Sequence, residues 1–193
     1  VSWSRGLGDV YKRQILKEAQ KLILSYGYQK VTMTDIAKAC RISRTTLYKS
    51  YPNKESIIIG LINEALEANI EATEKLLVVQ GTFASKLEQF FDIWTIKPAA
   101  SVIELATGRD ILLNVATYAP EAVDNHYRIF ESMLARLIRG EMKEQKDISP
   151  EDLARIFTLA SKGMKASAEK IEELERMIAG PVSYTHLRAH ETN

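Results

Sequence analysis

One short stretch of the sequence gathers side chains that are suited to bind a nucleic acid. Over residues 44–49 the chain reads RTTLYK, and in a helix Leu47 would turn toward a core while its neighbours face outward. Arginine, lysine, threonine and tyrosine donate hydrogen bonds to phosphates and base edges, and threonine methyl groups can contact thymine. The outward-facing candidates are Arg44, Thr45, Thr46, Tyr48 and Lys49.

The distribution of charge supports a polyanionic partner for the first part of the chain. The 193 residues together carry a net charge of only +1. From Ile15 to Lys54, eight basic and two acidic residues give +6, whereas from Glu55 to the end 15 basic and 22 acidic residues give −7. A basic segment of this kind attracts a polyanion such as DNA, and an acidic segment does not.

Short helices are expected to hold this stretch in place. Residues 15–26 carry apolar side chains at helical spacing, and Gly27 follows them as glycine often follows a helix. A second helix is expected to have Thr34 as its N-cap and Asp35 in its first turn, and to end near Arg41.

A third helix, over residues 44–50, would carry the candidate side chains. Ser43 precedes it as an N-cap, and Pro52 ends it because the residue before a proline avoids the helical conformation. Asn53 then caps a fourth helix, whose first turn contains Lys54. The N-terminus of that helix can receive a phosphate, which makes Lys54 a candidate DNA-binding residue.

The motifs TDIA (34–37), IS (42–43), TLY (46–48) and YPNKE (51–55) together resemble the N-terminal domain of TetR-family transcriptional regulators. The resemblance implies a head of three helices, with the third helix lying in the major groove of DNA. Arg41 departs from the pattern, because the family often has a glycine there, a residue that tolerates a positive φ angle at little cost.

The resemblance also implies roles for individual residues. Thr34 and Lys54 would hold phosphates, and Tyr48 would reach a phosphate, with core packing as the alternative for Tyr48. Core packing is the favoured role of Tyr51. The remaining members of the expected DNA-binding set are Ser43 and the side chains that would approach bases, namely Arg44, Thr45, Thr46 and Lys49.

The hydropathy pattern predicts an all-α fold. Hydrophobic residues make up 46% of the chain, glycine and proline number only 9 and 5, and apolar residues recur at helical spacing. The expected architecture is a three-helix helix-turn-helix DNA-binding head at residues 15–55, with the motif at about 32–51, and a helical body at 56–179. The resemblance makes that body an effector-binding and dimerisation domain, joined to the head by a long helix over 56–79.

Several further helices are expected in the body. They cover residues 83–96 (ended by Pro98), 101–106, 108–119, 120–143, and a segment from Ser149 to about 179. Apolar seams on the last two helices favour a four-helix bundle made by two copies of the chain, although both seams could instead face their own body. A homodimer would place its two heads about 34–36 Å apart on a near-palindromic double-stranded DNA operator.

TetR-like regulators hold a small molecule in the body, and its binding releases DNA. Candidate pocket residues here are Phe90, Phe91, Trp94, Tyr118, His126, Tyr127 and Phe130, each with core packing as the alternative. No run of arginine or lysine points inward, so an apolar or aromatic effector is preferred. The leading hypothesis is a repressor released by a small-molecule effector. The alternatives are a TetR-like DNA binder controlled by a protein partner, and a helical enzyme.

Nothing in the motifs favours catalysis. The sequence contains no glycine-rich phosphate loop, no HExxH and no GxSxG. His126 has no evident acid or nucleophile partner, and the single Cys40 permits neither an internal disulfide nor a thiolate metal site. We therefore expect no catalytic residue, no metal site and no cofactor. The apolar runs are too short to span a bilayer, which predicts a soluble cytoplasmic protein associated with the nucleoid.

The two ends of the chain look foreign to the rest. Residues 1–14 and 182–193 show no clear helical period, and both resemble translated sequencing-adapter read-through. We therefore expect residues 1–14 and 180–193 to be non-native or disordered. For this reason no metal site is assigned to His186 and His190.

Overall fold

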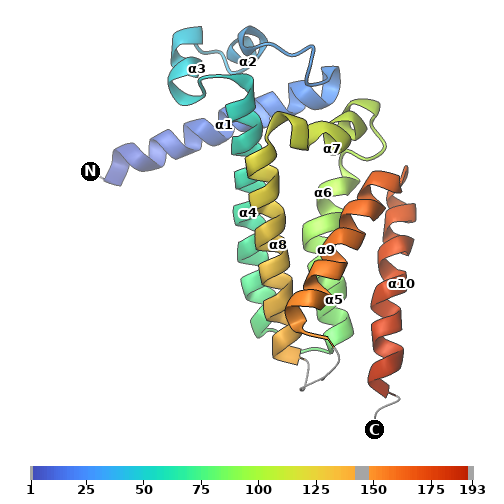
Figure 1. Cartoon of the computed structure of the whole chain (residues 1–193). Helices are drawn as coiled ribbons and strands as arrows, with labels where there is room; N and C mark the ends of the chain where they lie inside the picture. Colours follow the sequence, from blue (N-terminus) through green and yellow to red (C-terminus); the bar gives the residue numbers. More distant parts are fainter. Residues whose placement is uncertain (1, 142–147, 191–193) are drawn as a thin grey trace.

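The computed structural model describes the backbone of residues 2–141 and 148–190 and the side chains of residues 10–141 and 148–182. Every regular element in these ranges is a helix, so the predicted all-α class is confirmed (Figure 1). The elements in chain order are α1 (Ser2–Tyr26), α2 (Met33–Ala39), α3 (Arg44–Ser50), α4 (Lys54–Val78), α5 (Phe83–Phe91), η1 (Asp92–Ile96), α6 (Lys97–Ala100), α7 (Ala106–Tyr118), α8 (Pro120–Glu141), α9 (Pro150–Ser167) and α10 (Ile171–His190).

Two hydrophobic cores divide the chain into a head and a body. The head core joins α1, α2, α3 and the first turns of α4, with Ile36 and Leu47 fully buried in it, and the end of α7 packs against it through Ala119. The body core joins α4 to the helices that follow, and its largest buried side chains are Trp94, Phe90 and Phe130. The long helix α4 belongs to both, as predicted, and runs from the head down the length of the body (Figure 1).

Short side-chain hydrogen bonds start the helices of the head. The N-cap of α2 is Thr32 rather than the predicted Thr34: its hydroxyl accepts from the Asp35 N–H at 3.2 Å, and the Asp35 carboxylate accepts from the Thr32 N–H at 3.0 Å. This reciprocal pair satisfies two N–H groups at once, which a cap at Thr34 could not do. The predicted caps Ser43 and Asn53 are both confirmed.

Both terminal helices extend into segments that lack a clear helical period. Helix α1 begins at Ser2 rather than at Ile15, and α10 runs through Pro181 to His190. The glycines of residues 1–14 weaken a helix by only about 1 kcal/mol each and do not end it. The described backbone is thus helical at both ends, and Val182 is buried in the body core, while the expectation that these ends are non-native or disordered stays a prediction. The foreign origin of both segments stays a prediction, and the side chains of His186 and His190 lie outside the described residues.

The chain between α5 and α7 differs from the prediction. Pro98 does not end the helix. A widened π-helical turn, η1, leads into α6. Pro98 is the second residue of α6, a position where a missing N–H is tolerated. The short helix expected over 101–106 is wrong, because residues 101–105 form a turn before α7. Gly108 lets α7 pack against that turn, since a Cβ there would lie 2.3 Å from the Val102 carbonyl oxygen.

The apolar seams of the last helices, α8 to α10, also differ from the prediction. The seam of α8 faces its own body, because Phe130, Leu134 and Leu137 are buried in the body core. The expected continuous seam from 153 to 178 is broken at residues 168–170 into α9 and α10, which lie side by side (Figure 1). The predicted end of α8 near Lys143 lies outside the described residues.

Candidate DNA-binding surface and effector site

The outer face of α3 carries the predicted DNA-binding side chains. Leu47 is fully buried in the head core and holds the helix in place. The side chains around it, Ser43, Arg44, Thr45, Thr46, Tyr48 and Lys49, are all exposed. In Figure 1, α3 lies at the end of the molecule opposite the tip of the body, where a long rod-shaped partner can approach it. This face offers cations and hydroxyl groups to a polyanion, as the sequence predicted.

A strained turn joins α2 to α3. Arg41 has a φ angle of 55°, in the left-handed region that side chains other than glycine avoid. Two backbone hydrogen bonds hold it there, from Arg41 N–H to the Lys38 carbonyl at 3.0 Å and from Ile42 N–H to the Ala37 carbonyl at 3.0 Å. This is the arrangement in which helices usually end on a glycine, so Arg41 occupies a glycine position at some cost in free energy.

Two of the residues predicted to bind phosphates, Thr34 and Lys54, are only partly exposed. Thr34 is half-buried within α2. The Lys54 ammonium donates to the backbone carbonyls of Tyr28 at 2.6 Å and Val31 at 2.9 Å, and lies 4.2 Å from the centre of the Tyr28 ring. Burial lowers the pKa of Lys54. Lys54 therefore ties α4 to the connector after α1, and its role as a phosphate ligand stays a prediction.

Tyr118, predicted as a pocket residue, lies at the junction of head and body. Its ring stacks on that of Tyr28, with the ring centres 4.0 Å apart and the planes at 25°. The Tyr28 hydroxyl donates to the Glu55 carboxylate at 3.3 Å. Burial, and then the charge of Glu55, raise the pKa of Tyr28 to about 12, so this hydroxyl stays neutral. The structure thus separates Tyr118 from the other six candidates.

Three of the remaining candidates form the centre of the body core. Phe90, Trp94 and Phe130 are at most 1% exposed, and their ring centres lie 5.1–5.8 Å apart. The Trp94 indole N–H donates to the Thr73 hydroxyl at 2.7 Å, which satisfies its one polar group. For these three residues the alternative of core packing is the one that the structure shows.

His126 and Tyr127 lie at the edge of the same cluster. The His126 ring is 5.4 Å from the Trp94 ring, and burial, followed by the charge of Lys165, lowers its pKa to about 4. The ammonium groups of Lys162 and Lys165 lie 3.9 and 4.9 Å from the centre of the Tyr127 ring. These two residues are half-buried.

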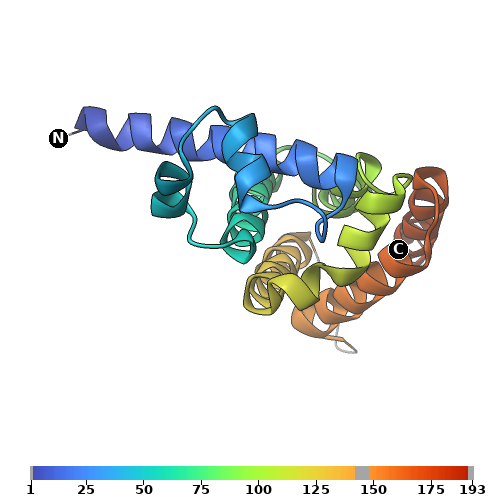
Figure 2. The ribbon, with the colours of Figure 1, turned by 90° about the horizontal axis from the view of Figure 1, so that it is seen from above.

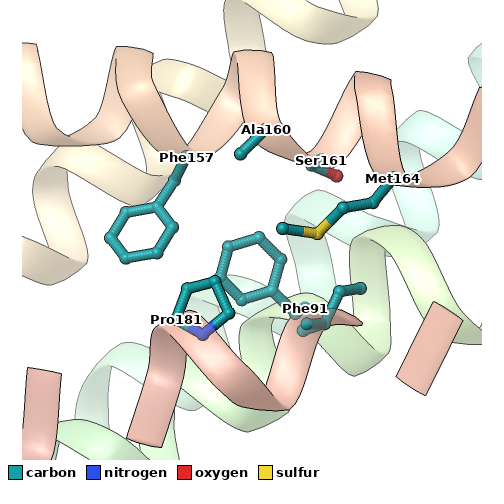
Figure 3. Close-up of a pocket in the computed structure, with 7 residues that line it drawn as sticks. Phe91, Phe157, Ala160, Ser161, Met164 and Pro181 are labelled. Carbon is teal, nitrogen blue, oxygen red and sulfur yellow. The ribbon is translucent and has the colours of Figure 1, made fainter. Parts of the chain in front are cut away.

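A small apolar crevice opens between α5, α9 and α10 (Figure 3). It contains about 190 Å³ of space, part of which is open to solvent. Its walls are Phe91, Phe157, Ala160, Ser161, Met164, Ile178 and Pro181, of which only Phe91 was predicted. Only about 10 Å³ of the crevice can take the centre of a water molecule, which is roughly the space that one water needs, so a ligand of ordinary size would have to widen it. Periodicity could not find it, because it depends on where α9 and α10 pack against each other.

Two kinds of feature are absent from the described part of the chain. No group of three or more histidine, cysteine, aspartate or glutamate side chains in the described residues could hold a metal ion. No helix there is long and apolar enough to cross a membrane.

Residues 15–61 match the domain described as "Bacterial regulatory proteins, tetR family". This stretch is a TetR-family domain. This confirms the resemblance seen in the sequence, and the match spans all three helices of the head and the first turns of α4. Among curated relatives, the chain is similar to the helix-turn-helix-type transcriptional repressor ComR of Escherichia coli, with 23% identity over 92% of this chain and 89% of that one.

Solved structures share the TetR-family fold over nearly the whole chain. A transcriptional regulator from Saccharomonospora viridis in complex with choline is 18% identical, with a TM-score of 0.69 over 89% of this chain and 95% of that one. Thermus thermophilus FadR, a TetR-family repressor in complex with lauroyl-CoA, is 22% identical, with a TM-score of 0.58 over 86% and 91%. Since the two ligands differ widely, the shared fold does not identify a ligand for this chain.

Proposed function

We propose that this TetR-family chain is a homodimeric repressor that binds a near-palindromic DNA operator and leaves it when a small molecule binds the body. The exposed α3 face of the basic head is the observation that carries the proposal. The proposed repressor acts in the cytoplasm, on the DNA of the nucleoid. The relatives named as repressors, and those solved with small molecules, support the same reading.

On DNA, Arg44, Thr45, Thr46 and Lys49 approach base edges, and the Tyr48 hydroxyl reaches a phosphate. Arg44→Ala should relax the sequence preference at one base pair of each half-site and cost about 1–3 kcal/mol of binding free energy there. Tyr48→Phe keeps the ring and removes only the hydroxyl, so it should weaken every duplex to a similar extent. If the two variants showed the same preferences, this division of roles would be wrong.

The decisive experiment selects duplexes from a random pool with the purified chain and measures their affinity by gel shift as salt is raised. Binding dominated by phosphates should weaken steeply with salt. A chain that binds no duplex even at low salt is not a DNA-binding regulator, and the α3 face would then need another partner.

The outer face of α9 is the surface proposed for dimerisation. Ile156 and Leu159 lie three residues apart and are 54% and 60% exposed, which is unusual for such large apolar side chains on one face. Gly163 on the same helix has open space beside it, so a second helix could approach closely. A second copy covering this face would bury both side chains. This replaces α8, whose seam is already buried, as the candidate partner surface.

Leu159→Glu should shift the chain from dimer to monomer in analytical ultracentrifugation, because a carboxylate would be buried in the interface. The matched control is Val78→Glu, which changes an apolar side chain that is 80% exposed at the end of α4. A dimer that survived Leu159→Glu would place the interface elsewhere.

For the effector we propose a ligand with an apolar body that enters the crevice between α9 and α10. Apart from the Ser161 hydroxyl, which lies 3.1 Å from the Thr95 hydroxyl, the walls are apolar. Met164→Trp should fill the crevice and abolish release of DNA by any compound that releases the native chain. Compounds are found by screening fatty acids and aromatic acids for a rise in melting temperature together with loss of the gel shift. A screen without such compounds would favour control by a protein partner.

A further inference from the structure

Three side chains from separate segments form one stack at the junction of head and body. The Lys54 ammonium of α4 lies 4.2 Å from the centre of the Tyr28 ring, which belongs to the connector after α1. The Tyr118 ring, at the end of α7, packs against the Tyr28 ring at 4.0 Å. A cation near an aromatic ring and a second ring stacked on it both attract the central ring. Tyr28 is 4% exposed, so these contacts are shielded from water.

Other contacts bring α7 to the same connector. The Thr107 hydroxyl donates to the Leu24 carbonyl near the end of α1, and the Gln29 amide lies 3.5 Å from the Tyr118 hydroxyl. Gly27, with a φ angle of 89°, turns the chain at this point, and a Cβ there would lie 3.7 Å from the Thr107 methyl group. Viewed from above, the end of α1 lies beside α7 (Figure 2).

The chain itself crosses from head to body only through α4. One helix leaves the head free to tilt and rotate about its first turn, whereas a second attachment point removes that freedom. Helix α7 provides this second attachment: Ala119 at its end is buried in the head core, and Ile111 and Val115 pack against that core. The stack is the part of the attachment that engages Lys54 in the first turn of α4 and the connector that follows α1. The position of α3 relative to the body therefore depends in part on whether the two tyrosine rings are in contact.

We infer that Tyr28 and Tyr118 are positioning residues for DNA binding: their stack transmits the state of α7 to the head. This inference rests on the proposed function, because it concerns how the body controls the α3 face. A ligand that moves the end of α7 would separate the rings and release the head. Coupling of this kind is reciprocal, so DNA bound at α3 must in turn restrain α7.

The experiment measures hydrogen exchange of the full chain with and without the DNA duplex selected from the random pool. In the native chain, DNA should slow exchange in α3 and also in α7, far from the DNA. Tyr118→Leu keeps an apolar side chain but removes the ring; in this variant DNA should still slow exchange in α3, while the slowing in α7 is lost. Tyr118→Phe, which keeps the ring, should restore the native response.

Three outcomes would overturn the inference. They are a native α7 that does not respond to DNA, a Tyr118→Leu chain whose α7 responds as strongly as the native one, and a Tyr118→Phe chain that behaves like Tyr118→Leu. Tyr28→Leu, tested in the same way, guards against an unfolded Tyr118→Leu, and a native-like circular dichroism spectrum is required of each variant. If the native chain binds no duplex, the proposed function fails; if α3 responds without α7, only the inference fails.

Discussion

The head presents its functional side chains on the outside of a short helix, whereas the body places most of its aromatic side chains in its own core. In the head, Leu47 is buried and the polar residues around it remain exposed. In the body, Phe90, Trp94 and Phe130 pack against each other, and a small apolar crevice lies beside Phe91. An exposed face for DNA exists before DNA is bound. A small ligand instead needs internal space, and that space depends on how whole helices are spaced.

The largest effect that would sharpen this comparison is expected at Trp94. If Trp94 is a core residue, Trp94→Ala should lower the free energy of unfolding by about 3–5 kcal/mol, because it leaves a cavity and removes the indole N–H that the Thr73 hydroxyl accepts. Urea unfolding followed by circular dichroism measures this loss. Trp94→Phe is the control, since it keeps a ring and loses only the indole N–H. A loss below about 1 kcal/mol for the alanine variant would contradict the core assignment.

A second prediction concerns a buried histidine of the body and uses a pH titration. His126 has a folded-state pKa of about 4, below its ordinary value of 6.5, because burial disfavours its charged form. The unfolded chain therefore binds the proton first, so stability is complete above pH 6.5 and falls as pH drops from 6.5 toward 4. The slope should approach, at most, about 1.4 kcal/mol per pH unit. His126→Gln should flatten the curve in this window, and an unchanged slope would show that other groups are responsible.

A smaller effect is expected at Lys54, where the two parts meet. Lys54→Ala leaves the Tyr28 and Val31 carbonyls without this donor and should lower the free energy of unfolding by about 1–3 kcal/mol. Lys49→Ala is the matched control on the exposed α3 face; it should weaken DNA binding and leave the melting temperature nearly unchanged. A Lys54→Ala chain of native stability with weakened DNA binding would instead restore the phosphate-binding role that the sequence suggested.

The smallest effect is expected in the turn of the head. Arg41→Gly should raise the free energy of unfolding by roughly 0.5–1 kcal/mol, since glycine adopts the left-handed conformation without strain. Arg41→Ala removes the same charge but keeps the Cβ atom, so thermal unfolding should show no such gain for it. If both variants behaved alike, the charge of Arg41 rather than its backbone angle would determine the effect.

The head could be predicted closely because its features are local. A cap acts within three residues, as Ser43 and Asn53 show, and the face that Leu47 buries determines which of its neighbours remain outside. The one error in the capping, Thr34 for Thr32, exchanged two threonines that are two residues apart. The contacts of Lys54 could not be predicted, because its partners, Tyr28 and Val31, lie more than 20 residues earlier in the chain.

The all-α class, the helix-turn-helix head and its outward-facing donors follow from the sequence alone, because caps, helical period and charge act over a few residues. Helix packing was needed to show that Tyr118 meets Tyr28 and that the seam of α8 faces inward. It also showed that residues 168–170 break the last seam in two and that an open apolar space lies beside Phe91. Each of these depends on which helices meet and at what distance, and side chains far apart in the chain acquire neighbours only when the helices pack.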